Sequence, residues 1–219
     1  MTLKSSIFLV IVILLVDQAS KIYIKTNFQL QESVALFSWF QLLFVENDGM
    51  AWGAKISDLF TFMSDRTAKV ILTLFRIVAV SGIAYWLVTA INKKATKILI
   101  VAICFILAGA LGNIIDSVFY GVLFNDSYGQ VASFLPVDGG YDKFLHGKVV
   151  DMLHFPLWKG RFPDWLPFWG GDAFTFFQPV FNVADIAIST GVGALLIFNN
   201  KAFKKPENNE AKNDESLEG

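Results

Sequence analysis

The sequence has very few of the residues from which most nucleophilic and metal sites are built. Its 219 residues include a single cysteine and two histidines. The one cysteine, Cys104, excludes an intramolecular disulfide and a cysteine-based metal site. The histidines, His146 and His154, lie outside the long apolar segments, and no HExxH motif is present. Hydrolysis by Ser or Cys needs a base within reach of the nucleophile, so this class of enzyme is not favoured.

Charge is also scarce, and hydrophobic residues replace it. Only 17% of the residues are charged, whereas 54% are hydrophobic and the mean hydropathy is +0.52. These values are typical of a polytopic membrane protein rather than a soluble domain. The net charge of −1 provides no bulk field for a polyanion, so no nucleic-acid partner is expected.

Four stretches are long and apolar enough to cross a bilayer, which predicts an all-α membrane protein with four transmembrane helices. They cover residues 7 to about 24, 68–91, 96–118 and 178–198. The first follows Lys4 in the manner of a signal peptide. It lacks a small-x-small cleavage site, so we expect it to be retained as a helix.

The basic residues that flank these stretches predict the orientation. With four crossings they all fall on one side, which the positive-inside rule makes cytoplasmic: Lys4, Lys93, Lys94, Lys97, Lys201, Lys204 and Lys205. Both termini are then cytoplasmic. We expect residues 1–205 to form a single membrane domain and the acidic residues 206–219 to form a disordered tail.

Two long connections are left on the outer side, at about residues 25–67 and 119–177. Residues 34–45 of the first are rich in aromatic and β-branched side chains and precede the turn-forming Asn47-Asp48-Gly49. This pattern predicts a small extracytoplasmic sheet on the membrane face. The second connection, before the last helix, contains prolines that forbid long helices and three tryptophans suited to the headgroup zone.

Several polar residues interrupt the apolar segments, and they share one layer in the outer half of the membrane. They are Asp17, Lys21, Arg76, Asn113, Asp116, Asn182 and Asp185. An ionisable residue costs about 2.5–3.5 kcal/mol at such depth on insertion scales, so it is normally functional or paired. At 1.5 Å per residue, Asp185 is expected about 10 Å below the outer end of its helix. The layer indicates one site that opens outward, and separate packing pairs are the alternative.

Spacing within the helices adds detail to this layer. Asp17 and Lys21 are four residues apart, so a salt bridge is available, and a structural role is favoured for them. Asn182 and Asp185 are three apart and share a helix face, so the amide could orient the carboxylate.

A pair of carboxylates is the best candidate for catalytic machinery. When two share a site, like-charge repulsion raises one pKa, so one can accept a proton while the other donates. Topology allows six partners for Asp185, namely Asp116, Asp138, Asp142, Asp151, Asp164 and Asp172. Asp151 is favoured because it stands in the apolar stretch Val149-Val150-Asp151-Met152-Leu153, which would desolvate it. A minimal metal triad of Asp151, His154 and Asp185 is a weaker alternative.

Five ordered motifs resemble those of the lipoprotein signal peptidases, the aspartic type II signal peptidases of bacterial inner membranes. They are Asp17-Gln18-Ala19-Ser20-Lys21, Glu46-Asn47-Asp48-Gly49-Met50-Ala51-Trp52, Gly109-Ala110-Leu111-Gly112-Asn113-Ile114-Ile115-Asp116, Val149-Val150-Asp151 and Phe181-Asn182-Val183-Ala184-Asp185. Any one of them alone is weak evidence. Together, in a four-span topology over residues 7 to about 200, they are highly specific.

The resemblance implies a function and a set of site residues. It implies that Asp151 and Asp185 are the catalytic dyad, that Asn47, Gly49, Asn113 and Asn182 orient it or bind substrate, and that Asp17, Lys21 and Asp116 support it. The implied substrates are diacylglyceryl prolipoproteins, cleaved at the lipobox cysteine in contact with membrane lipid near the periplasmic face. No cofactor or metal is implied.

The sequence departs from the family pattern in two places. The family commonly has Arg after the third-helix Asp, whereas this chain has Ser117. We hypothesise that Arg76 supplies the missing cation near Asp116 or the dyad; unchanged cleavage and folding of Arg76→Leu would contradict this. Residues 125–148 also form a longer connection than usual, which could be a lid, a partner site or an extension.

Two other classes of function compete with the peptidase. A small proton-coupled transporter or channel would also carry intramembrane Asp and Arg. Against it, nothing polar continues from the outer layer to the cytoplasm. A non-enzymatic membrane assembly factor could instead use the outer sheet as a docking surface.

Overall fold

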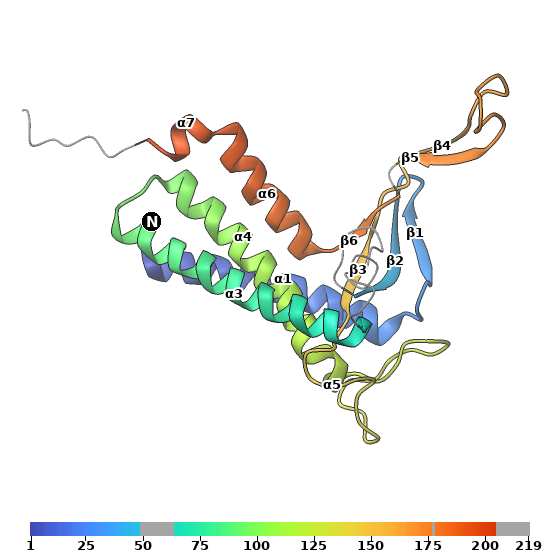
Figure 1. The fold of residues 1–219 in the computed structure, drawn as a ribbon, viewed down its shortest axis with the longest axis horizontal. Coiled ribbons are helices and arrows are strands. Elements are labelled where there is room, and N and C mark those ends of the chain that lie inside the picture. Colours follow the sequence, from blue (N-terminus) through green and yellow to red (C-terminus); the bar gives the residue numbers. More distant parts are fainter. Residues whose placement is uncertain (49–63, 177, 205–219) are drawn as a thin grey trace, which may run out of the picture.

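The structure is a computed structural model that describes residues 1–48, 64–176 and 178–204. Its helices are α1 (Leu3–Asn27), α3 (Asp65–Asn92), α4 (Lys97–Ile115), the π-helix η2 (Asp116–Tyr120), α5 (Gly121–Leu123), α6 (Val183–Ile197) and α7 (Asn199–Ala202). Its strands are β1 (Ser33–Phe37), β2 (Phe40–Asn47), β3 (Val149–His154), β4 (Trp158–Arg161), β5 (Ala173–Phe176) and β6 (Val180–Phe181). The helices form a bundle, and the strands gather at one end of it (Figure 1).

Three of the predicted spans are confirmed as long apolar helices. By length and composition, residues 3–27, 65–92 and 97–123 can each cross a membrane, the last because η2 and α5 continue α4. Helix α6 is shorter, at 15 residues. Among the described residues the chain therefore has three candidate spans and one shorter apolar helix.

The last helix begins at Val183, so the prediction that it starts at residue 178 is wrong. Asn182 is its N-cap, with extended backbone, and its side chain accepts a hydrogen bond from the Asp185 N–H. Asp185 accepts one in return from the Asn182 N–H, which completes a capping box. The preceding Val180–Phe181 pair with β3 as strand β6. Asp185 therefore lies in the first turn of α6, not about 10 Å inside the helix.

Helices α4 and α6 pack closely because glycines line their contact. A Cβ on Gly109 would lie 2.2 Å from the Ala184 carbonyl oxygen, and one on Gly191 would lie 2.6 Å from that of Ala102. Only glycine permits such an approach, as in other membrane helix pairs. The contact fixes the first turn of α6 against the outer part of α4.

The predicted small sheet is present, with more strands than residues 34–45 suggested. That segment is a hairpin of β1 and β2, and the sheet has the antiparallel order β1-β2-β3-β6. Val45 on β2 stands opposite Asp151 on β3. Phe44, Val150 and Met152 are fully buried between the sheet and the outer end of the bundle. The separate hairpin of β4 and β5 projects away from the other strands (Figure 1).

The connection of residues 125–148 is packed onto the end of the bundle that carries the sheet. The Gly147 N–H donates to the Ser117 carbonyl at 2.9 Å, and the buried Ser127 hydroxyl accepts from Lys25 Nζ at 2.9 Å. Lys25 also forms a buried ion pair with Glu46 of β2. These contacts favour a structural extension over a detached lid.

Candidate active site

The two predicted catalytic carboxyls meet around one residue, Asn182. Its Nδ2 donates to Asp151 Oδ1 at 2.7 Å, while its backbone N–H donates to Asp185 Oδ2 at 3.2 Å. Asp151 comes from the middle of the sheet and Asp185 from the first turn of α6. The N-cap position thus brings the two carboxyls to one place, as the sequence predicted.

The other two predicted asparagines also reach these carboxyls. Asn113 Nδ2 donates to Asp185 Oδ1 at 2.9 Å, and Asn47 Nδ2 donates to Asp151 Oδ2 at 3.2 Å. Asn113 Oδ1 accepts from Asn182 Nδ2 at 3.2 Å, which joins the asparagines of α4 and α6. Each carboxyl is therefore held in a fixed orientation by amide donors on separate elements.

Asp151 sits in an environment that favours its neutral form. Its side chain is almost wholly buried, with 3% of the residue exposed. Burial, together with the negative charge of Asp185, raises the pKa of Asp151 to about 7, although hydrogen bonds from Asn47 and Asn182 oppose the shift. Near neutral pH, Asp151 can therefore hold a proton beside a second carboxylate.

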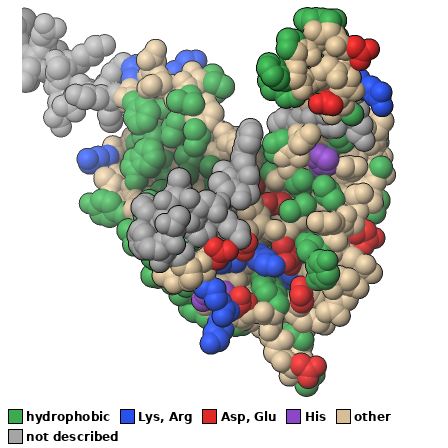
Figure 2. Space-filling view, turned by 45° about the vertical axis from the view of Figure 1, so that its right-hand side comes forward, with side chains coloured by type: hydrophobic (Ala, Val, Ile, Leu, Met, Phe, Trp, Pro, Cys, Tyr) green, Lys and Arg blue, Asp and Glu red, His purple; other side chains and the backbone are tan. Residues whose placement is uncertain are grey.

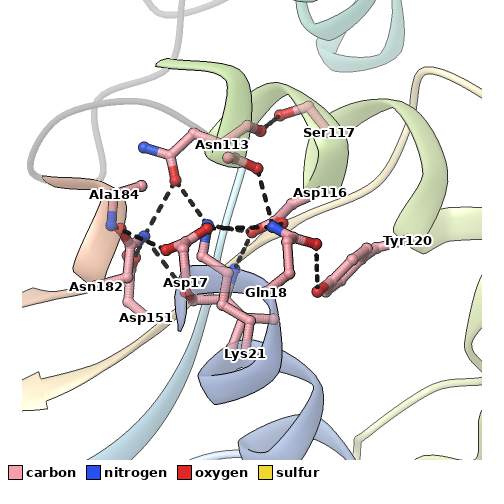
Figure 3. Close-up of polar contacts among 12 residues, drawn as sticks. Asp17, Gln18, Lys21, Asn113, Asp116, Ser117, Tyr120, Asp151, Asn182 and Ala184 are labelled. Atoms are coloured by element: carbon pink, nitrogen blue, oxygen red, sulfur yellow. Dashed lines mark hydrogen bonds and ion pairs between the residues drawn. The ribbon is translucent and has the colours of Figure 1, made fainter. Parts of the chain in front are cut away.

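A buried ionic cluster of Lys21, Asp17 and Asp116 lies next to these carboxyls (Figure 3). Lys21 Nζ lies 2.9 Å from Asp17 Oδ2 and 2.8 Å from Asp116 Oδ2, and it also donates to Asn113 Oδ1 at 2.9 Å. All three charged side chains are at most 1% exposed. The predicted Asp17–Lys21 salt bridge is thus confirmed, with Asp116 as a third member.

The cluster's carboxylates also accept hydrogen bonds from the backbone of α6 and β3. Asp17 Oδ1 accepts from the Ala184 N–H at 2.8 Å, in the first turn of α6. Asp116 Oδ2 accepts from the Val150 N–H at 3.2 Å, one residue before Asp151. A carboxylate at a helix N-terminus is favourable because the free N–H groups and the helix dipole point at it.

The comparisons with known proteins identify the family of the chain. A family model described as signal peptidase (SPase) II matches residues 9–200. The chain belongs to the signal peptidase II family. A lipoprotein signal peptidase of Porphyromonas gingivalis is 47% identical over 190 residues, which cover 86% of this chain and 80% of that protein. One of Amoebophilus asiaticus is 37% identical over 196 residues, 87% of this chain and 75% of its own length.

A solved structure has the same fold. It is described as a bacterial membrane enzyme, is 24% identical and has a TM-score of 0.57, with 91% of this chain and 94% of that chain covered. Family membership makes this protein a membrane protease that removes signal peptides from prolipoproteins. The comparisons therefore support the peptidase over the transporter and the assembly factor.

Two polar residues of this signal peptidase II were not among the sequence-predicted site residues. Gln18 Nε2 donates to Asp116 Oδ1 at 2.9 Å and to the Gly112 carbonyl at 3.2 Å, and the Tyr120 hydroxyl donates to Gln18 Oε1 at 3.1 Å. Figure 3 shows Gln18 beside Asp116, with the Tyr120 hydroxyl bonded to it. Gln18 could have been predicted, because it is an uncharged amide next to Asp17 in an apolar helix. It was missed because the prediction for this segment relied on its charged residues.

The departures from the signal peptidase II pattern have different outcomes. The buried Ser117 hydroxyl donates to the Asn113 carbonyl at 2.9 Å, and the cation beside Asp116 is Lys21. Arg76 is half-buried on α3, within electrostatic reach of Asp185. Of the two places considered for Arg76, the dyad is therefore the one favoured. Gly49 lies outside the described residues.

The remaining alternatives concern other carboxylates and a metal. Within residues 1–48, 64–176 and 178–204, no group of three or more His, Cys, Asp or Glu lies close enough to hold a metal ion. His154 instead contacts Gln41 through Nδ1 at 2.5 Å. Asp142 pairs with Arg66 at the outer rim.

Proposed function

We propose that this signal peptidase II is an aspartic endopeptidase in which Asp185 is the general base and Asp151 the general acid. The observation that carries the proposal is the shared contact of both carboxyls with Asn182, together with the pKa of about 7 for Asp151. Two carboxyls in unlike environments divide the acid and base roles in this way. Asp151 holds the proton, and Asp185 is ionised.

The reaction follows from these protonation states. Asp185 takes a proton from water as the water oxygen attacks the scissile carbonyl, and Asp151 donates a hydrogen bond to the carbonyl oxygen. The tetrahedral intermediate then breaks its C–N bond, and a proton passes from the dyad to the leaving nitrogen. Asn47, Asn113 and Asn182 keep the carboxyls oriented throughout.

The supporting residues have separate parts in this proposal. Lys21, Asp17 and Asp116 fix α6 and β3 relative to each other. Arg76 brings a positive charge within electrostatic reach of Asp185.

We propose the diacylglyceryl prolipoprotein as substrate, cleaved just before its lipid-modified cysteine. The enzyme should shorten a purified lipid-modified precursor, seen as a shift in mass, and should cleave the same precursor without the diacylglycerol far more slowly. An aspartic mechanism needs no metal, so EDTA should leave the rate unchanged. Equal cleavage of both precursors would contradict the substrate assignment, and loss of activity in EDTA would contradict the mechanism.

The proposed topology is one domain of residues 1–205 with four crossings in the bacterial inner membrane. Lys93 and Lys94 in the α3–α4 connection, Lys201 in α7 and the N-terminus all lie at the same end of the bundle (Figure 1). The positive-inside rule makes this end cytoplasmic. The site, at the opposite end, then lies near the periplasmic face. The proposed acidic tail of residues 206–219 lies outside the described residues.

The pH dependence of cleavage tests the acid role of Asp151. Below its pKa of about 7 Asp151 is protonated and active as an acid, and above this value it loses the proton. kcat/KM should therefore fall about tenfold per pH unit on the alkaline side of pH 7. The measurement is kcat/KM for a lipid-modified precursor between about pH 5 and 9, at steps of about half a pH unit.

The Asn47→Ala variant supplies the matched control for this profile. The Asn47 amide donates to Asp151 and favours its ionised form, so its removal should move the alkaline limb to higher pH. A limb that moves to lower pH, or a rate that rises through pH 8, would assign the proton donor to another group.

A further inference from the structure

Five aromatic rings form a continuous row across the outer sheet, which we call the aromatic row: Phe37, Trp39, Phe40, Phe155 and Phe181. Neighbouring rings are stacked, with centroids 5.4 Å apart for Phe37 and Trp39, 4.7 Å for Phe40 and Phe155, and 5.5 Å for Phe155 and Phe181. The Trp39 ring also stacks on the Phe155 ring, with centroids 6.1 Å apart, and this contact links Phe37 and Trp39 to the other rings. The interplanar angles of these four pairs are 20° or less, so the rings form one continuous stack.

The outer end of the row is open to its surroundings. Phe37 is 60% exposed and Trp39 is 50% exposed. The inner end, Phe181, directly precedes Asn182 and so stands where the chain enters α6. Helix α6, which follows the row in the chain, also exposes apolar side chains, including Ile186 at 43% and Leu196 at 73% exposure.

The depth of this row follows from the length of α6. Its inner end is fixed, because the Thr96 hydroxyl at the start of α4 donates to the Ala202 carbonyl of α7 at 2.8 Å. Its outer end is level with Gly112 and Asn113, because a Cβ on Gly112 would lie 3.2 Å from Ala184 Cβ. Asn113 comes sixteen residues after Lys97. At 1.5 Å per residue, this level lies about 24 Å from the inner end.

A hydrocarbon core is about 30 Å thick, so the start of α6 lies about 6 Å short of its outer boundary. Chain that comes just before α6 must then be immersed in the outer leaflet or thin the bilayer there. The segment at this place is β6, with the aromatic row beside it. Aromatic rings are the side chains best suited to the boundary between acyl chains and headgroups.

We propose that the aromatic row is a lipid-binding surface, on which outer-leaflet phospholipids lie with their upper acyl chains and glycerol groups. The row then holds the sheet, and with it Asp151, at the depth of Asp185. This inference rests on the proposed four crossings. It goes beyond the chemistry of the dyad, because it assigns an occupant to a surface outside the catalytic contacts.

A nitroxide label beside Trp39 tests the depth directly. In a Cys104→Ala background, Ser38→Cys places the label in the exposed β1–β2 turn, and Tyr128→Cys places it on the connection after α5, at a residue that is 80% exposed. In phosphatidylcholine–phosphatidylglycerol liposomes, the label at 38 should collide more often with oxygen, which concentrates in lipid, than with a water-soluble nickel chelate. The label at 128 should show the reverse preference.

A second measurement uses the native ring. Phosphatidylcholine brominated high on its acyl chains should quench the wild-type protein more strongly than Trp39→Phe, which keeps the ring stack but removes one fluorophore. A water-like label at 38 and equal quenching of the two proteins would overturn the inference. Cleavage is assayed on the same liposomes. If the label at 38 lies in lipid but cleavage survives the Asp151→Asn substitution, the catalytic dyad alone is refuted. If the label at 38 lies in water but cleavage is lost in Asp151→Asn, the lipid-binding surface alone is refuted.

Discussion

Asp151→Asn and Asp185→Asn should each lower the rate of prolipoprotein cleavage by at least about a thousandfold, because each removes one half of the proton transfer. Asparagine has nearly the same shape as aspartate but can neither accept the proton from water nor deliver one to the substrate. The two residues act as one unit, so the double variant should be no slower than the single variants. The measurement is single-turnover cleavage of a lipid-modified precursor.

Asp164→Asn is the matched control for these variants. Asp164 belongs to the same outer connection as Asp151, is exposed, and lies in the β4–β5 hairpin away from Asn182. Its replacement should leave the rate unchanged. Both dyad variants should unfold close to the wild-type temperature, since asparagine nearly matches the shape of the aspartate that it replaces. Measurable turnover at near the wild-type rate in either dyad variant would exclude the acid–base assignment.

The sequence pointed to these residues because polar side chains are conspicuous in membrane helices. Asp17, Lys21, Asn113 and Asp185 each interrupt an apolar run, and the bilayer penalises such residues unless they are paired or used. Helical spacing then predicted the Asp17–Lys21 salt bridge, which is confirmed. The choice of Asp151 over five other aspartates was weaker on physical grounds, and the family resemblance decided it.

The parts that the sequence did not predict depend on contacts between distant segments. The place where α6 begins is set by strand pairing of Val180 and Phe181 with β3, some thirty residues earlier in the chain. The local signal was present, since Asn182 and Asp185 have capping-box spacing, but the apolar run around them favoured a longer helix. The hairpin within residues 34–45 was likewise hidden because its two-residue turn contains Trp39, which is not a typical turn residue, and neither glycine nor asparagine.

The corrected helix start changes how the site is understood. With Asp185 in the first turn, the N–H groups of Ala184 and Asp185 donate to the side chains of Asp17 and Asn182 instead of being used inside the helix. The site is then the junction of a helix end and a sheet, and its geometry depends on whatever joins them. In this protein the joining group is the buried cluster of Lys21 with Asp17 and Asp116.

Lys21→Met should therefore be the most destabilising single change in the bundle, at about 3–5 kcal/mol, because it leaves two buried carboxylates without their cation. The loss should appear as a lower unfolding temperature in detergent and as unfolding at a lower mole fraction of SDS. Cleavage should fall as well, since Lys21 also holds Asn113, which donates to Asp185. Lys4→Met is the matched control, because Lys4 lies exposed on the same helix and should tolerate the change.

A compensated variant separates charge from packing in this cluster. Adding Asp17→Asn and Asp116→Asn to Lys21→Met removes the orphaned charges, and the amides can still accept from the Ala184 and Val150 N–H groups. This triple variant should regain much of the lost stability but not the wild-type rate, because Asn113 still lacks its Lys21 donor. If Lys21→Met were as stable as Lys4→Met, the cluster would not be what fixes α6 against β3. If the triple variant were as unstable as Lys21→Met alone, lost packing rather than uncompensated charge would be the cause.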